Sequence, residues 1–410
     1  MLRLKSFKPR SATTLAASAS ALVLLGMATP SLAQVRSPGE PPQANTAEAG
    51  LWGIAEQTEI YARRSGDLNK DAALNAYVSD LTCRIAADHC KDIRVYVMDR
   101  PMFNAMAAPN GYVEVWTGLM LRASTEDELA FVLGHEVGHF LEEHGYERMR
   151  ALKITGNVLM VFSLAAAGAG AYYQVDVSGL IDAVYLSSMA AYFGYSQANE
   201  SQSDAMGLEM VHRMGLDTSA GALIWENQRA ETAASSFRSV RRSEAYGSVF
   251  RTHPLTVSRI EALNAQSKTL GSDGIGLEDR QRYRAIIRPY LSDWIEDEHR
   301  HRDFGRLLHL LERLGRDGED LGVIQYHTGE VYRRRRGEGD ELLAVNAYRA
   351  AVTHADVPVA AYRELGTLEA RTGNPDAART AFETYIQLAP EAEDLWVVED
   401  QLSRLEGKNA

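Results

Sequence analysis

Residues 124–141, STEDELAFVLGHEVGHFL, predict a single amphipathic helix. Thr125 and Glu128 have the spacing of a capping box, and acidic residues in the first turn suit the positive end of the helix dipole. Apolar residues then recur at helical spacing. They are Leu129, Val132, Leu133, Val137, Phe140 and Leu141. The helix is therefore expected from its pattern before any residue in it is assigned a chemical role.

The same helix carries His135-Glu136-Val137-Gly138-His139. Residues four apart on a helix point the same way, so His135 and His139 can present two imidazoles to one ion, with Glu136 beside them. Zinc accepts such ligands tetrahedrally, and in catalytic sites it leaves one position to a water whose pKa falls to about 7. We expect one zinc ion per chain, with Glu136 as the general base. A chance match is disfavoured by the apolar context.

A third ligand is needed. Gly145 stands where a histidine six residues past the second would be, which excludes that way of completing the site. Residues 199–204, NESQSD, supply a glutamate on a second helix. We expect Glu200 to bind zinc and Asp204 to accept a hydrogen bond from a ligand imidazole. Glu209 is the rival ligand.

His253 lies far from the motif, in Arg251-Thr252-His253-Pro254. A donor there can steady the oxyanion of a tetrahedral intermediate or occupy the open zinc position at rest. Packing of a loop is the alternative. We count His253 as a candidate catalytic residue.

The region before the motif predicts helix over residues 49–92 and a small sheet after it. Residues 93–97 and 111–117 alternate apolar and polar side chains, and Pro109-Asn110-Gly111 between them is typical of a turn. An exposed edge at 111–117 near the zinc can pair with an extended peptide. A strand packed only for the core is the alternative.

The C-terminal region contains a repeat. Ala344, Tyr348 and Asp356 recur as Ala378, Phe382 and Pro390 at an offset of 34, whereas Gly329 and Gly366 are 37 apart. We attribute the difference to a turn near 337–339 that is about three residues longer. The pattern resembles the tetratricopeptide repeat over about 320–395, and such helix pairs form a concave protein-binding surface.

The N-terminus predicts export. Residues 1–33 have a basic start, an apolar stretch and a Ser31-Leu32-Ala33 cleavage pattern, and 34–48 suit a flexible lead-in. An uncleaved anchor is disfavoured because the apolar stretch is short. In an oxidising compartment Cys83 and Cys90 can form a disulfide, with free thiols as the alternative.

Residues 154–171 are almost wholly apolar. They predict a buried helix, a membrane-contacting or lid segment, or a membrane span, in that order of preference. The formal net charge of -12 argues against nucleic acid as a partner. The basic run Arg333–Arg336 is interpreted as a solvated helix face.

Together the motifs resemble those of the HtpX/BepA-type zinc metallopeptidases, whose relatives include the Oma-type and CAAX prenyl endopeptidases. The resemblance spans about residues 50–265. The matching segments are Asn104-Ala105, Pro109–Tyr112, Thr117–Leu119, Asp127–Ala130, Val132–His139, Asn199-Glu200, Asp204–Gly207 and Thr252–Pro254. It implies zinc ligands at His135, His139 and Glu200, and a catalytic Glu136. Gln197 and Gln202-Ser203 depart from the family pattern without removing a ligand.

The export signal and repeat are similar to the BepA-type periplasmic branch, which implies a role in outer-membrane protein quality control. The expected fold is α+β and mostly α, with a zincin-like domain over 49–270 and a helical repeat domain over 285–405. The expected function is that of a periplasmic zinc endopeptidase acting on extended or misfolded polypeptides, with a protein partner at the repeats. Two alternatives stand: a repeat-based adaptor or chaperone with a gated zinc site, and a protease held at the membrane by 154–171.

Overall fold

The computed structural model describes residues 36–151, 195–242, 253 and 257–407. The chain divides into two compact units, Met1–Arg36 and Ser37–Ala410. The predicted export signal at 1–33 and the apolar stretch at 154–171 lie outside the described residues. Within the described part of the chain, no helix is both long enough and apolar enough to cross a membrane.

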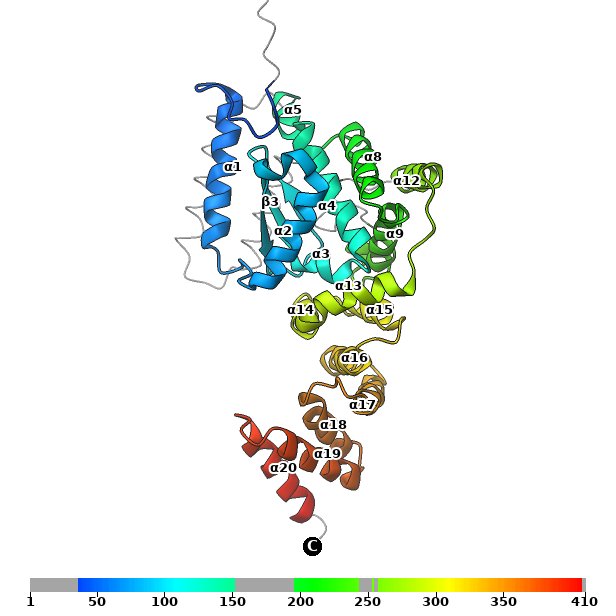
Figure 1. Ribbon diagram of the computed structural model, residues 1–410. Coiled ribbons are helices and arrows are strands. Elements are labelled where there is room, and N and C mark those ends of the chain that lie inside the picture. The colour runs from blue at the N-terminus through cyan, green and yellow to red at the C-terminus, as the bar shows by residue number, and fades with distance from the viewer. Residues whose placement is uncertain (1–35, 152–194, 243–252, 254–256, 408–410) are drawn as a thin grey trace, which may run out of the picture. The chain divides into compact units, whose positions relative to one another are not determined.

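Three α-helices, a 3-10 helix and a small sheet lie between residue 36 and the motif helix (Figure 1). In order they are α1 Ala47–Arg64, α2 Ala72–Ala86, the 3-10 helix η1 Ala87–Asp92, β1 Arg94–Met98, β2 Ala105–Ala107, β3 Tyr112–Trp116 and α3 Thr117–Arg122. The helical region expected at 49–92 is thus divided. The division follows from local capping, because the Thr46 side chain accepts from Ala49 N and the Asp71 side chain accepts from Leu74 N.

The sheet has the strand order β1-β3-β2, with β3 parallel to β1 and antiparallel to β2. Both expected strands are present, and β2 is an addition. The interpretation of 111–117 as an exposed edge is wrong, because β3 is the central strand and all five of its residues are buried. Val113 and Val115 face the core of α2 and α4, whereas Tyr112 and Trp116 pack in the cluster with α1. The edge strand nearest the motif helix is β2, which contacts α4.

The motif helix is α4, Glu126–Leu141, and Thr125 caps it by accepting from Glu128 N at 3.2 Å. The Glu128 carboxylate accepts from Ser124 N at 2.8 Å, one residue before the position that a capping box requires. The helices that follow in this region are α5 His144–Ala151, α8 Gln197–Arg213, α9 Ala220–Ala233, α10 Arg238–Arg242, α12 Val257–Leu270, α13 Leu277–Ile287 and the 3-10 helix η2 Arg288–Tyr290.

The C-terminal part is all helical in the described residues (Figure 1). Its helices are α14 Leu291–His299, α15 Phe304–Gly315, α16 Leu321–Arg335, α17 Asp340–Ala351, α18 Ala360–Arg371, α19 Pro375–Leu388 and α20 Leu395–Gly407. Helix α16 packs with α17, and α18 packs with α19. A Cβ on Gly329 would lie 2.6 Å from the Tyr348 ring, and one on Gly366 would lie 2.6 Å from the Phe382 ring. The positions aligned in the sequence therefore make equivalent contacts.

The three extra residues of the first helix pair are not all in the turn. Residues 336–339 link α16 to α17, and residues 372–374 link α18 to α19, so the connection differs by one residue. The other two extra residues lie in the helices. Gly329 is one residue further from the end of α16 than Gly366 is from the end of α18. Ala344 is one residue further from the start of α17 than Ala378 is from the start of α19. The expected three-residue turn extension is corrected to one.

One hydrophobic cluster runs from Leu74 in α2 to Val331 in α16, so α13, α14 and α15 pack on the same core as the motif helix. Buried ions also cross this junction. The Arg122 guanidinium of α3 is 2.8 Å from Glu231 of α9 and 2.7 Å from Glu298 of α14. Because such charges are costly to bury without partners, the junction requires all three.

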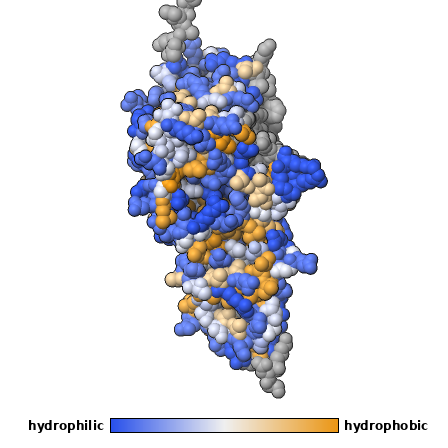
Figure 2. All heavy atoms as spheres, turned by 90° about the vertical axis from the view of Figure 1, so that its right-hand side faces the viewer, coloured by the Kyte–Doolittle hydropathy of each residue, from blue (hydrophilic) through white to orange (hydrophobic). Residues whose placement is uncertain are grey.

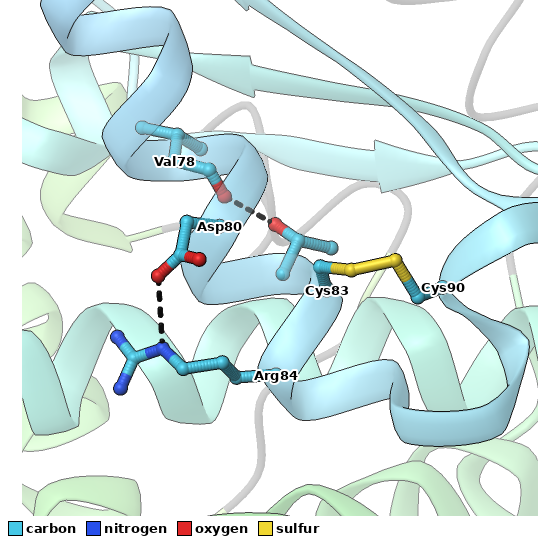
Figure 3. Close-up of a disulfide and its surroundings, with 6 residues drawn as sticks. Val78, Asp80, Cys83, Arg84 and Cys90 are labelled. Atoms are coloured by element: carbon cyan, nitrogen blue, oxygen red, sulfur yellow. Dashed lines mark hydrogen bonds and ion pairs between the residues drawn. A yellow bond between two sulfur atoms is a disulfide. The ribbon is translucent and has the colours of Figure 1, made fainter.

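Two smaller sequence expectations are resolved by the structure. Cys83 at the end of α2 and Cys90 in η1 form the expected disulfide (Figure 3). The basic run at the end of α16 is ion-paired rather than merely solvated, because Arg334 contacts Glu296 and Glu330, and Arg335 contacts Asp340.

Candidate metal centre

The candidate centre forms where α4 crosses α8, and glycines set the distance between the two helices. A Cβ on Gly134 would lie 3.1 Å from the Cα of Gly207, and a Cβ on Gly207 would lie 2.9 Å from the backbone nitrogen of His135. One turn further on, a Cβ on Gly138 would lie 3.3 Å from the Cα of Ser203. Backbone therefore packs on backbone. This close approach lets side chains of α4 and α8 converge immediately beside the crossing.

Four side chains converge at this point: His135 and His139 from α4, Glu200 from α8, and His253. Nε2 of His135 lies 3.0 Å from Nε2 of His139 and 3.2 Å from Nδ1 of His253. The two Glu200 oxygens lie 3.5 Å from Nε2 of His135 and of His139. None of the four exposes more than 2% of its surface. Glu209, the rival ligand, lies on the exposed side of α8.

The donor set fits a zinc ion. Two ligands at about 2.0–2.1 Å from a tetrahedral ion are separated by about 3.3 Å, and the distances here are 3.0–3.5 Å. Imidazole nitrogens converging this closely need a shared proton or a shared cation, since their lone pairs repel one another. His135, His139 and Glu200 would hold the ion, with His253 at the fourth position.

Neighbouring groups orient each ligand. His135 donates from Nδ1 to Oδ1 of Asp204 at 3.0 Å, the role expected for Asp204. Nδ1 of His139 shares a hydrogen bond of 2.8 Å with Nδ1 of His144, which is buried at the start of α5. Both imidazoles therefore have their second nitrogen engaged and their Nε2 directed at the common point. His144 acts through His139 rather than by facing the ion.

Glu136 lies next to the four donors without being one of them. Its Oε2 accepts a hydrogen bond of 3.0 Å from the backbone nitrogen of Ala107 in β2, and its Oε1 is 3.4 Å from Nε2 of His253. Burial raises the pKa of Glu136, although the nearby imidazoles oppose the shift. A carboxylate with a raised pKa beside an ion site is suited to take up a proton.

The electrostatics of two of the four donors, His139 and Glu200, suit metal binding. Burial lowers the pKa of His139 well below its usual value, which favours the neutral form that ligates. Burial alone would raise the pKa of Glu200, but His253 and His139 hold it well below its usual value, so the carboxylate stays ionised. Arg259 and His135 likewise lower the pKa of Asp204 against the effect of burial.

Two residues at the site were not found from the sequence. Arg259 of α12 is 3% exposed and reaches both acids, with Nε 2.7 Å from Asp204 and Nη1 2.7 Å from Glu200. The Tyr195 ring stacks on His139 with centroids 3.7 Å apart. Neither residue has a spacing that relates it to the motif. Their proximity depends on how α12 and the chain before α8 pack against α4.

A buried His-Glu-x-x-His helix, completed by a glutamate from a second helix, defines a class of protein: the zinc metalloendopeptidases. Residues 68–267 match the family model described as Peptidase family M48. The chain therefore contains a Peptidase M48 domain, and the matched segment contains every residue of the centre described above.

Similar proteins agree with this assignment. The chain is 23% identical to the beta-barrel assembly-enhancing protease of Escherichia coli K12 over 60% of this chain and 50% of that protein. It is 28% identical to the mitochondrial metalloendopeptidase OMA1 of Schizosaccharomyces pombe over 46% of this chain and 51% of the relative. The mitochondrial metalloendopeptidase OMA1 of Bos taurus is also 28% identical, over 32% of this chain and 25% of the relative. The match thus spans about half the length of these relatives or less.

Proposed function

We propose that this chain is a zinc-dependent endopeptidase that cleaves extended or misfolded polypeptides in the periplasm, with Glu136 as its general base. One observation carries the proposal. Four nitrogen and oxygen donors converge beside a buried glutamate, and that glutamate is hydrogen-bonded to the edge strand β2. Ion site, proton acceptor and a strand with an edge position therefore lie within one another's reach.

When bound, zinc would supply a Lewis acid that polarises a carbonyl and lowers the pKa of water to about 7. The chain's own residues do the rest. Glu136 takes the proton of the attacking water at Oε2 or Oε1 and gives it to the leaving amine. Asp204 and His144 keep the two imidazoles in one orientation through Nδ1.

The substrate is proposed to be extended because β2, although its three residues are buried, is the edge strand nearest Glu136. A peptide that adds to a sheet edge is held through its main chain, which makes binding tolerant of sequence. This tolerance suits a protease for misfolded proteins. Pairing of an extended peptide with a sheet edge is therefore still proposed, but at β2 and not at 111–117.

His253 is proposed to occupy the fourth position at rest and to withdraw when substrate enters. Its Nδ1 lies 3.0 Å from Glu200 and 3.2 Å from His135, so it sits among the ligands. We expect His253→Ala to lower zinc affinity and change the rate of casein cleavage. Unchanged turnover and unchanged zinc affinity would remove His253 from the site.

The C-terminal helices are proposed to be a tetratricopeptide-type domain over 285–405 that binds a protein partner. The equivalent Gly329–Tyr348 and Gly366–Phe382 contacts support a repeat. Figure 2 shows apolar side chains at the surface of this part of the chain, and Leu342 and Trp396 are 62% and 69% exposed. An adaptor or chaperone role remains the second candidate, favoured by these exposed apolar residues.

The decisive experiment compares three glutamate variants in casein cleavage and zinc content. Glu136→Gln should lose about 10²–10⁴-fold in turnover while retaining zinc, because only the proton acceptor is removed. Glu200→Gln should lose zinc, and Glu209→Gln, on the exposed side of the same helix, should change neither. Full cleavage by Glu136→Gln would remove Glu136 as the general base, and an unaffected phenotype of this variant in cells would favour the adaptor role. Stoichiometric zinc in Glu200→Gln would overturn the ligand set.

A further inference from the structure

A second cluster of metal-ligating side chains lies between α14 and α16, outside the centre described above. It consists of Glu296 and His299 from α14 and His327 from α16. One donor atom from each lies within 4.8 Å of the others. His299 is 2% exposed and His327 is 1% exposed, so the two histidines lie in the core of the junction.

The buried imidazoles lack hydrogen-bond partners. Among the described residues, three ring nitrogens have no hydrogen-bond partner: both nitrogens of His299 and Nδ1 of His327. Only Nε2 of His327 is engaged, at 3.0 Å from the Ser292 hydroxyl. Buried polar atoms in native proteins are nearly always paired, so three orphaned nitrogens at one place indicate a missing binding partner.

The spacing and chemistry of the cluster suit a divalent transition metal. Glu296 and His299 are three apart on one helix face, the Glu-x-x-His arrangement that helical metalloproteins use for inward-facing ligands. Two imidazoles and a carboxylate match ions such as zinc better than calcium or magnesium. Burial lowers the pKa of His299 to about 4 and that of His327 to about 3, so both rings are in the neutral, ligating form.

One ion pair competes with this arrangement. Arg334 lies 2.8 Å from Glu296. The same guanidinium is also 2.9 Å from Glu330, which is almost fully buried. Arg334 therefore keeps a partner when the half-exposed Glu296 rotates toward the histidines. Such a rotation changes only the distances from Glu296 to the two rings, which must shorten to about 3.3 Å for a tetrahedral ion.

We propose that Glu296, His299 and His327 bind a second divalent transition-metal ion of the zinc type, which cross-links α14 to α16. Helix α14 is tied to the peptidase region through the Glu298–Arg122 pair, and α16 opens the paired C-terminal helices. The ion thus fastens the repeats to the peptidase region. The proposal is independent of the proposed activity, because it uses none of the residues of the peptidase centre.

The test is zinc stoichiometry and affinity of the purified full chain, measured by equilibrium dialysis and elemental analysis. Wild type should bind two zinc ions per chain, and His299→Ala and His327→Ala one each. Glu296→Gln should weaken the second ion at least tenfold. Its matched control is Glu341→Gln, because Glu341 is 46% exposed and paired with Arg371, much as Glu296 is 45% exposed and paired with Arg334.

Two outcomes overturn the proposal: a zinc content that is the same in folded wild type, His299→Ala and His327→Ala at saturating zinc, or an affinity for the second ion that is the same in Glu296→Gln and Glu341→Gln. Far-UV circular dichroism shows whether each variant is folded. If the histidine variants unfold, the glutamate pair still decides, since both of those side chains are half-exposed and neither substitution alters the core.

Discussion

Two helix pairs in this chain meet at a glycine, with different results. In α4–α8 the glycines of both helices face one another, and a Cβ on Gly134 would lie 3.1 Å from the Cα of Gly207. In α18–α19 the glycine faces a ring, and a Cβ on Gly366 would lie 2.6 Å from Phe382. Where backbone packs on backbone, the two helices lie close together, so side chains just beside the crossing can reach one another. No large side chain fits at the crossing itself. Backbone against a ring fills the crossing with apolar atoms.

The motif helix α4 and the C-terminal helix α19 also differ in how much of their surface is buried. All residues of α4 from Asp127 to Phe140 are buried, including its charged and imidazole groups. Helix α19 buries only Ala378, Ala381, Phe382 and Tyr385. Its Leu388 is 53% exposed. A helix buried on every side can hold a reactive group away from bulk water, whereas a helix buried on one face presents the other to partners. We therefore expect substitutions in the α4–α8 pair to affect stability and zinc binding more than substitutions in the α18–α19 pair.

The largest effect is expected from Gly207→Ala. The added methyl would lie 2.9 Å from the backbone nitrogen of His135 and 3.2 Å from the backbone oxygen of Phe131. Backbone cannot rotate away, so we expect a loss of about 3 kcal/mol or more in the free energy of unfolding. Zinc affinity should fall with it, because Glu200 moves away from the histidines.

Gly53→Ala in α1 is the control, because nothing lies within 4 Å of the added carbon. This variant should be stabilised by about 0.5–1 kcal/mol. Urea unfolding followed by circular dichroism measures both variants. Equal stability of the two would show that the α4–α8 crossing tolerates separation.

A smaller effect is expected from the charge buried in the first turn of α4. Burial raises the pKa of Glu128 to about 7, although Arg313 opposes the shift. Since the folded pKa lies above the unfolded value of 4.5, the native state holds the proton more tightly. Stability is therefore fully present below about pH 4.5 and is lost as pH rises toward 7, by up to about 3 kcal/mol.

Glu128→Gln should remove this loss, since an amide does not ionise. The free energy of unfolding of wild type and variant should be compared between pH 4.5 and 8. As the pH rises from 4.5 to 8, the free energy of unfolding of wild type should fall relative to that of Glu128→Gln. Parallel curves would mean that Glu128 is solvated in the folded chain.

The smallest effect is expected from Gly366→Ala in the α18–α19 pair. The methyl meets the Phe382 ring, which can tilt, so a loss of about 1–2 kcal/mol is expected. Zinc content and casein cleavage should stay unchanged, and Phe382→Leu in the same chain should recover part of the stability. Loss of zinc in Gly366→Ala would contradict the separation drawn between the two pairs.

Local features were predictable from the sequence to different degrees. The cap at Thr125 and the strands β1 and β3 follow from hydrogen bonding and alternation within a few residues. Strand β2 was missed because three residues, Ala-Met-Ala, have no alternation to detect. The edge position assigned to 111–117 was wrong because strand order depends on pairing between separate segments.

The sequence by itself determined the motif helix, the direction shared by His135 and His139, and the disulfide partners, because each depends on spacing within a few turns of chain. The tertiary structure decided what meets that helix. It brought Glu200 rather than Glu209 to the histidines, added Arg259 from α12, and placed His253 beside them. These positions are set by helix crossings between segments that lie far apart in the chain, and no local pattern shows which two helices cross.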